Sequence, residues 1–442
     1  MSNQERRSGL PGTPRYLPRG LTMLLWVLLA AGVLTFLLEA TGPNHLRTWQ
    51  IFLVNFLFWS GMAQGGLVFA AIYEIVRAGW GGTVRRLAEG LGVFMPISFL
   101  LFFVLFLGRE TLFPWILDPV PEKQAWLNVP FLFARNAIAL LLLYGAGLAY
   151  LYYSLRPDVG MVDRPARRLD HGIYYVFTRN WRGLEAELER RRNVLAVLAP
   201  LYILLYTLVF SLLGFDLAMS LDPHWYSTLF GAYFFMSSFY LGLAATAIIA
   251  VLARRALGLH RHIARGQLHD LGKLLFGFCL VTGDFFWSQF VVIWYGNIPE
   301  ETQYIILRAK EMPWAPLSWV VLVVAFLIPF FVLLSRWAKR APSVMLAVGV
   351  LIAAGMWLER YVLVVPSLWH GEAAPLGWLE AGVTAGFLGA VGLSYVFFLQ
   401  HFPILVQGDR DEQKAASDWH RLPISGAPGD RAGSGAGTPH GH

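Results

Sequence analysis

Residues 49–72 read WQIFLVNFLFWSGMAQGGLVFAAI, a run of 24 residues without a single Asp, Glu, Lys or Arg. About 20 consecutive apolar residues suffice for an α-helix to cross the hydrocarbon core of a bilayer, so this stretch predicts a transmembrane helix. The whole chain has the same character, because 56% of its 442 residues are hydrophobic and only 14% are charged. That composition excludes an ordinary soluble protein, in which about a quarter of the residues are charged.

The opening stretch has a partner later in the chain, which predicts an internal repeat. Residues 225–248, WYSTLFGAYFFMSSFYLGLAATAI, align with 49–72 without gaps, and Gly66 falls opposite Gly242. The next segments, 86–94 and 270–278, follow in the same order and place Glu89 opposite Lys273. Two repeats that begin four spans apart have the same orientation in the membrane, which predicts two parallel four-helix bundles.

Uninterrupted apolar stretches predict ten transmembrane helices and hence an all-α, polytopic membrane fold. The expected spans lie near residues 21–40, 50–76, 88–108, 130–154, 194–219, 226–252, 271–297, 315–335, 343–365 and 378–401. In the bundle scheme, spans 2–5 form the first bundle, spans 6–9 form the second, and spans 1 and 10 are peripheral. The predicted units are an N-terminal tail at 1–20, peripheral helix 1 at 21–48, the first bundle at 49–219 with a cytoplasmic loop at 155–193 that contains a short surface helix, the second bundle at 220–366, peripheral helix 10 at 367–406 and a disordered tail at 407–442.

The positions of the basic residues predict the orientation of the chain. If the N-terminus is cytoplasmic, the inner segments hold 28 of the 35 Lys and Arg, the outer loops hold 5, and Arg135 and Arg360 lie inside spans. Such an excess of positive charge marks the cytoplasmic side, so we expect both termini there. The net charge of +7 therefore reflects topology and does not indicate a nucleic-acid partner.

The chain is poorly equipped to carry electrons itself. Cys279 is its only cysteine, which excludes a thiolate zinc site and an iron-sulfur cluster held by this chain alone. None of the eleven histidines falls near the middle of a predicted span, which argues against a bis-histidine haem. We therefore expect no metal site and no covalently bound cofactor in this chain, and any redox centres must lie on partner subunits.

Polar residues near the predicted outer boundaries form one group of candidate site residues. Arg135 and Asn136 lie in the fourth span, and Asp216 lies near the end of the fifth. The connection that follows contains Asp222, His224 and Trp225. A polar pocket for a quinone is one interpretation of this group. The other is that Arg135 extends to the interface along its aliphatic stem and that Asp216 is an ordinary helix-end carboxylate near water.

Ionisable residues inside the spans form a second group, because such residues are costly in a bilayer and often functional. Asp284 lies close to the bilayer centre, with Lys273 before it and Gln289 after it on the seventh span. Glu89, Glu359 and Arg360 complete the candidate proton pathway. A purely structural role is the alternative for all six. Because Glu359 and Arg360 are adjacent, their side chains should diverge by about 100° and seek other partners, with Asp216 or Asp284 available to Arg360.

Three segments carry a resemblance to a known family. GFDLAMSLDPHWYSTLFGAYFF (214–235), HDLGKLLFGF with FWSQFVVIWYGNIPEET (269–302) and WLNVPFLFARN (126–136) resemble the NrfD/PsrC-like membrane subunits of alternative complex III, a quinol:cytochrome c oxidoreductase, and most closely the second such subunit, ActF. The resemblance spans about residues 20–405. It implies ten helices in two four-helix bundles, a bound quinone or menaquinone, and haem and iron-sulfur groups on partner chains.

The resemblance also implies a bacterial inner membrane, partners and a role in a respiratory chain. The expected partners are a sister NrfD-like subunit, a periplasmic iron-sulfur protein, cytochrome c subunits and small membrane subunits. In that family the quinol site is assigned mainly to the sister subunit, so a proton pathway and complex assembly are the expected contributions of this chain. One alternative is an NrfD-type anchor that oxidises quinol itself and passes electrons to a molybdenum or iron-sulfur partner, and a remote one is a secondary transporter.

Overall fold

The computed structural model describes residues 17–161 and 172–405, and within them all regular secondary structure is helical. Ten of its helices are long and apolar enough to cross a membrane, in agreement with the predicted fold class. Most of the predicted N-terminal tail and the tail predicted to be disordered lie outside the described residues. The sidedness of the termini stays a prediction.

The membrane-crossing segments follow one another in a simple order. Their bounds are α2 Arg19–Glu39, α3 His45–Ile75, the composite α4 Gly82–Glu89 with η1 Gly90–Phe94 and α5 Met95–Leu107, α7 Val129–Gly160, α9 Leu184–Leu217, α10 Phe230–Ala256, α11 Arg265–Gly296, the composite α13 Trp314–Val321 with η6 Leu322–Leu327 and α14 Ile328–Leu334, α16 Pro342–Val364 and α17 Trp378–His401. Short helices lie between them, namely α6 Arg109–Leu112, α8 Ile173–Thr178, α12 Pro299–Ala309 and α15 Arg336–Arg340, together with the 3-10 turns η2 Pro114–Ile116, η3 Pro121–Lys123 and η5 Met219–Leu221.

Several helices begin earlier than the hydropathy predicts, among them those of the third and fifth spans. The third span starts at Gly82 and the fifth at Leu184, although apolar stretches begin only near residues 88 and 194. The early turns of both helices are rich in charged residues, which a hydropathy window rejects, yet these residues are good helix formers. Residues 155–160 and 184–193, which were assigned to the long connection, are therefore helical, and the short helix α8 lies at 173–178.

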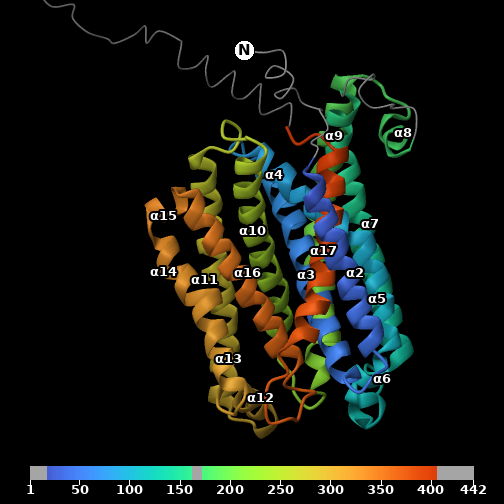
Figure 1. Ribbon diagram of the computed structural model, residues 1–442, viewed down its shortest axis with the longest axis vertical. Helices are drawn as coiled ribbons and strands as arrows, with labels where there is room; N and C mark the ends of the chain where they lie inside the picture. Colours follow the sequence, from blue (N-terminus) through green and yellow to red (C-terminus); the bar gives the residue numbers. More distant parts are fainter. Residues whose placement is uncertain (1–16, 162–171, 406–442) are drawn as a thin grey trace, which may run out of the picture.

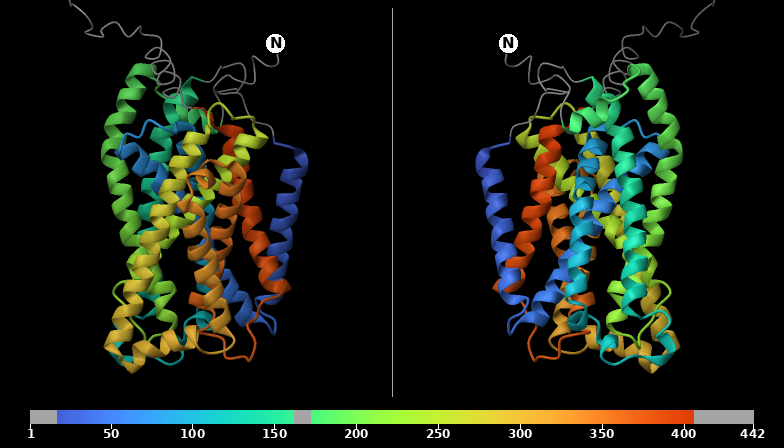
Figure 2. Two further views of the ribbon diagram at one scale, coloured as in Figure 1. Left: turned by 90° about the vertical axis from the view of Figure 1, so that its left-hand side faces the viewer. Right: turned by 90° about the vertical axis from the view of Figure 1, so that its right-hand side faces the viewer.

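The helices pack in two groups that meet along α3 and α10 (Figure 1). The first group consists of α3, α4 with α5, α7 and α9, and the second consists of α10, α11, α13 with α14, and α16. Helices α2 and α17 pack against each other at the periphery, and α17 also contacts α3 (Figure 2). This packing follows the expected scheme, whereas the residue boundaries of the two bundles stay a prediction.

Glycine allows the closest approaches between helices. A Cβ atom on Gly242 of α10 would lie 2.3 Å from the carbonyl carbon of Gly65 on α3. A Cβ on Gly32 of α2 would lie 2.2 Å from the Cα of Gly386 on α17. Small residues at such crossings bring two backbones into van der Waals contact, which drives helix association in a membrane. The same Cβ would lie 2.4 Å from the backbone nitrogen of Gly66, so both glycines of α3 are at this contact.

The single cysteine has a structural role next to an irregular turn. Residues Leu322–Leu327 form a π-helical turn just before Pro329, which has no backbone N–H to donate. The Tyr240 hydroxyl donates to the Ala325 carbonyl at 3.0 Å, and the Cys279 thiol lies 3.6 Å from the Phe326 carbonyl. These side chains satisfy carbonyl groups in the irregular turn, as the membrane interior requires.

Candidate functional site

A buried ion pair lies at the centre of the predicted outer polar group. This group is at the end of the molecule that carries α6 and α12, the lower end in Figure 1. Arg135 on α7 donates from Nε and Nη2 to the two carboxylate oxygens of Asp216 on α9, at 2.7 and 2.6 Å. Asn136 donates to the same carboxylate at 2.6 Å, and the Trp126 indole donates at 3.0 Å. Asp216 is fully buried. Arg135 therefore ties α7 to α9, and the interpretation that it only extends to the interface is wrong.

Asp222 and His224 take a different position from Asp216, although they follow it closely in sequence. They line a cavity of about 560 Å³ at the α12 end, together with Asp118, Trp314 and His370. Asp222 also lines a neighbouring cavity of about 240 Å³ with Trp126 and Trp225. Within the described residues no hydrogen bond or ion pair joins Asp222 or His224 to Arg135. The predicted outer group thus falls into two parts: Arg135, Asn136 and Asp216 form the ion pair and its hydrogen bonds, whereas Asp222 and His224 line the cavity.

Trp225 belongs to a stack that sequence reasoning missed. Its ring is buried and lies parallel to the Tyr304 ring of α12, with centroids 3.7 Å apart. The guanidinium carbon of Arg308 lies 3.4 Å from the centroid of the Tyr304 ring. The sequence signal that identifies Arg308 is its place four residues after Tyr304 on a short amphipathic helix.

Arg308 fastens α12 to the end of α16. Its Nε and Nη2 donate to the carbonyls of Val362 and Leu363 at 3.0 and 3.2 Å, and Nη2 also reaches the Ser367 hydroxyl at 2.7 Å. A cation beside the last carbonyls of a helix is favoured by the helix dipole. Burial lowers the pKa of Arg308, and burial raises the pKa of the Tyr304 hydroxyl.

Glu359 and Arg360 form the polar centre of the second bundle. Arg360 donates from Nη1 to both Glu359 oxygens at 2.9 and 2.7 Å, and from Nη2 to the hydroxyls of Ser237 and Ser238 at 2.8 and 3.0 Å. The Tyr233 hydroxyl donates to Glu359 at 2.7 Å. The expectation that these neighbours diverge and that Arg360 pairs with Asp216 or Asp284 is therefore wrong. Both side chains are long enough to turn toward each other where α16 faces α10.

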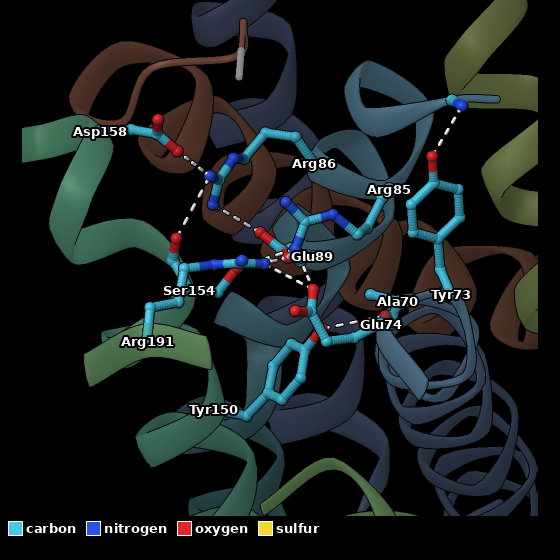
Figure 3. A network of polar contacts seen from close by, with 11 residues as sticks. Ala70, Tyr73, Glu74, Arg85, Arg86, Glu89, Tyr150, Ser154, Asp158 and Arg191 are labelled. Atoms are coloured by element: carbon cyan, nitrogen blue, oxygen red, sulfur yellow. Dashed lines mark hydrogen bonds and ion pairs between the residues drawn. The ribbon is translucent and has the colours of Figure 1, made fainter. Parts of the chain in front are cut away.

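The predicted Glu89 lies in an ionic cluster at the opposite end of the first bundle (Figure 3). It is fully buried and accepts hydrogen bonds from Arg85, Arg86 and Ser154 at 3.1, 2.6 and 2.7 Å. The cluster continues through ion pairs of Arg85 and Arg191 with Glu74 and of Arg86 with Asp158. Three arginines thus face three carboxylates from α3, α4, α7 and α9.

Most of this cluster was not predicted from the sequence, because its arginines were used only to predict which side of the membrane is cytoplasmic. Arg85 and Arg86 precede Glu89 by four and three residues, the spacing at which helical side chains are neighbours. That spacing could have identified the pairs on α4. Nothing in the sequence pairs Glu74 with Arg191 or Arg86 with Asp158, because those residues lie 117 and 72 positions apart.

Among the residues that the structure describes, no hydrogen bond connects the three predicted residues of α11 to the other groups. Lys273 pairs with Asp270 at 2.6 Å, and its side chain is 56% exposed. Asp284 is exposed on the helix surface, and Gln289 is half-buried with its Oε1 atom unpartnered among the described residues. The repeat alignment placed Lys273 opposite Glu89, yet one of them is exposed and the other is fully buried. Within the described part of the chain no three His, Cys, Asp or Glu side chains gather as a metal site would require.

Comparison with known proteins places the chain in a family. A family profile described as polysulphide reductase, NrfD matches residues 39–371, which include the α7–α9 ion pair, the α4 cluster and the centre of the second bundle. A comparison with curated proteins returned no match. Because the matched region covers most of the chain and contains nine of its ten candidate spans wholly or in part, this protein belongs to the NrfD family of membrane subunits.

Proposed function

We propose that this NrfD-family chain is the ActF-type membrane subunit of a quinol:cytochrome c oxidoreductase of the alternative complex III type. In this proposal the chain conducts protons and holds the complex together, while iron-sulfur and haem groups on partner chains carry the electrons. One observation supports the proton pathway above all, namely a column of polar side chains that follows the first bundle from one end to the other.

Helix α7 carries most of the polar side chains at the two ends and in the middle of this column. The buried face of α7 carries Asn136, Tyr144, Tyr150 and Ser154. Asp158 continues the series at the α4 end through its ion pair with Arg86. Residues 136 and 158 are separated by about 33 Å along a helix. That length is close to the thickness of the hydrocarbon core, about 30 Å.

Side chains from α3, α5 and α9 fill the intervals between these residues. The Tyr144 hydroxyl contacts Ser98 at 2.9 Å, and Ser98 contacts Ser60 at 2.6 Å. One turn further along α3, Gln64 accepts a hydrogen bond of 2.6 Å from the Tyr202 hydroxyl. Hydroxyl and carboxyl groups in such a series can each pass a proton to a neighbour.

The column still requires water at two points. Gln64 Nε2 and Asn136 Oδ1 are buried and lack hydrogen-bond partners among the described residues. Buried amide groups of this kind are satisfied by internal water, which can bridge the intervals that the hydroxyls leave. Lys273, Asp284 and Gln289 stay predictions, because any path through them would have to run along the exposed face of α11.

The proposed proton path through the column is tested by replacing one of its tyrosines with phenylalanine, which removes the hydroxyl and keeps the aromatic ring. Tyr202→Phe breaks the contact with Gln64, and Tyr395→Phe is a matched control because its hydroxyl donates to the Leu87 carbonyl outside the column. The intact complex is reconstituted in liposomes, and proton release per quinol oxidised is measured. We expect Tyr202→Phe to lower this ratio several-fold at nearly unchanged quinol turnover. An unchanged ratio would remove the pathway and leave assembly as the role of the chain.

A second candidate function is quinol oxidation by this chain itself. The cavity of about 560 Å³ at the α12 end favours it, because His224, His370, Asp118 and Asp222 could donate to and accept from the two oxygens of a quinol. A photoreactive quinone analogue should then label this chain, and His224→Leu should abolish the labelling. His45→Leu is the control, because His45 is exposed and does not line the cavity.

A further inference from the structure

One side of α11 presents a regular strip of uncovered residues. Exposed or half-buried positions recur every three to four residues along the helix, and we name Lys273, Gly277, Leu280, Asp284, Trp287, Val291 and Trp294 the α11 strip. Leu280, Trp287 and Trp294 are 46%, 60% and 67% exposed. The buried residues of α11, including Leu275 and Cys279, lie on its other side. A spacing of 3.5 residues is the one that keeps a helix in contact with a second helix over many turns.

Asp284 makes this strip unsuitable for contact with lipid alone. It lies 19 residues after Arg265 and 12 before Gly296, about 28 and 18 Å from the two ends of α11. Asp284 is therefore well inside the hydrophobic layer, it is exposed, and no hydrogen bond or ion pair reaches it within the described residues. Charged side chains at such depth almost always face protein or water and pair with another group.

Gly277 gives the same strip room for a second backbone. A Cβ atom placed on Gly277 would meet nothing within 4 Å, so no other helix among the described residues packs closely against this glycine. Gly65, Gly32 and Gly386 are different, because each of them lies against another helix of the chain. A glycine two turns from Asp284 allows a neighbouring helix to approach closely at that point.

We propose that the α11 strip is the docking surface for a transmembrane helix of a different protein chain, and that this helix carries a Lys or Arg at the depth of Asp284. The basic group would pair with the Asp284 carboxylate and remove the cost of its exposure to hydrocarbon. A second copy of this chain is the wrong partner. Two copies inserted in the same orientation are related by an axis along the membrane normal, which places Asp284 opposite Asp284. Like charges at close range repel strongly in a medium of low dielectric constant.

This proposal is independent of the proton column, which lies in the first bundle. It does bear on Asp284 as a proton carrier, because any such path would run along the interface between two chains. The two proposals can therefore fail separately.

The test begins with cross-linking in native membranes that contain the whole complex. A photoreactive phenylalanine analogue replaces Leu280 in one variant and Leu204 in the other. Leu204 is the matched control, because it is a leucine of α9 that is 57% exposed. We expect Leu280 to give an adduct with one other membrane protein, at about tenfold higher yield than Leu204 gives with that same protein. Peptide mapping should place a Lys or Arg within one helical turn of the cross-linked depth.

Charge reversal then tests the pairing itself. Asp284→Lys should lower the amount of that partner that co-purifies by about tenfold or more, and exchanging the partner's basic residue for Asp should restore it. Asp284→Asn keeps the side-chain volume, so it should weaken association in the same direction even if Asp284→Lys fails to fold. An adduct with a second copy, an adduct with lipid alone, or a partner segment without a basic residue at that depth would overturn the proposal.

Discussion

Arg135 on α7 and Asp216 on α9 are joined by two parallel hydrogen bonds of 2.6 and 2.7 Å, and the carboxylate is completely buried. A two-pronged contact of this kind fixes both distance and orientation between two helices. It closes the first bundle at the α12 end, whereas the cluster around Glu89 closes the same bundle at the α4 end. Ion pairs therefore hold the helices of the first bundle together at both of its ends.

Removing only one partner of the Arg135–Asp216 pair should lower the free energy of unfolding more than replacing both partners with apolar residues. Asp216→Leu leaves a buried guanidinium without its carboxylate, and we expect the free energy of unfolding to fall by about 3–5 kcal/mol. The double variant Arg135→Met with Asp216→Leu removes both charges and should recover most of that loss. Unfolding in detergent, followed by tryptophan fluorescence, measures both. A double variant as unstable as the single one would argue against a buried pair.

The two glutamates of the ionic cluster at the α4 end, Glu89 and Glu74, should contribute unequally to the stability of the protein. Glu89 is fully buried and accepts from two arginines and a serine, so Glu89→Gln should lower the free energy of unfolding by about 3–5 kcal/mol. Glu74 is the matched control, because its side chain is 20% exposed and water can replace its contacts. Glu74→Gln should cost about 1 kcal/mol or less. Equal losses in the two variants would contradict the burial of Glu89.

The polar centre of the second bundle allows a comparison of two tyrosines. The Tyr233 hydroxyl donates to the Glu359 carboxylate at 2.7 Å, and the Tyr361 hydroxyl donates to the neutral Pro375 carbonyl at 3.0 Å. Hydrogen bonds to charged groups are worth about 1.5–3 kcal/mol and neutral ones about 0.5–1.5 kcal/mol. Tyr233→Phe should therefore destabilise the protein more than Tyr361→Phe does, as measured by thermal unfolding in detergent. The reverse order would mean that Tyr233 does not serve Glu359.

The contact between α3 and α10 should be intolerant of a single methyl group. Gly242→Ala would place its Cβ 2.3 Å from the backbone of Gly65, so the helices must separate at a cost of about 1–3 kcal/mol or more. Gly145→Ala is the control, because a Cβ there meets nothing within 4 Å and alanine is the better helix former. Thermal unfolding should show a lower midpoint for the first variant only. A normal midpoint for Gly242→Ala would place the close contact elsewhere.

Some site residues could be predicted from sequence and others could not, for a specific reason. Asp216, Glu359 and Arg360 were recognised because a charge inside an apolar stretch stands out, and Glu89 because it lies at the start of one. Asp158 and Arg191 were not, because they lie at the charged ends of helices where a solvent-exposed residue looks the same. Asp284 had the clearest sequence signal, yet its side chain points away from the rest of the described chain.

The sequence by itself determined the ten helices, because hydrocarbon excludes unpaired backbone groups and any apolar stretch of sufficient length must form a helix. It also determined the family through residues 39–371. Only the tertiary structure decided which charges pair. Pairing depends on the rotation of each helix about its own axis, and a rotation of about 100° per residue turns neighbouring positions to different faces. That rotation is fixed by packing between helices far apart in sequence, which is why Arg135 faces Asp216 while Asp284 faces outward.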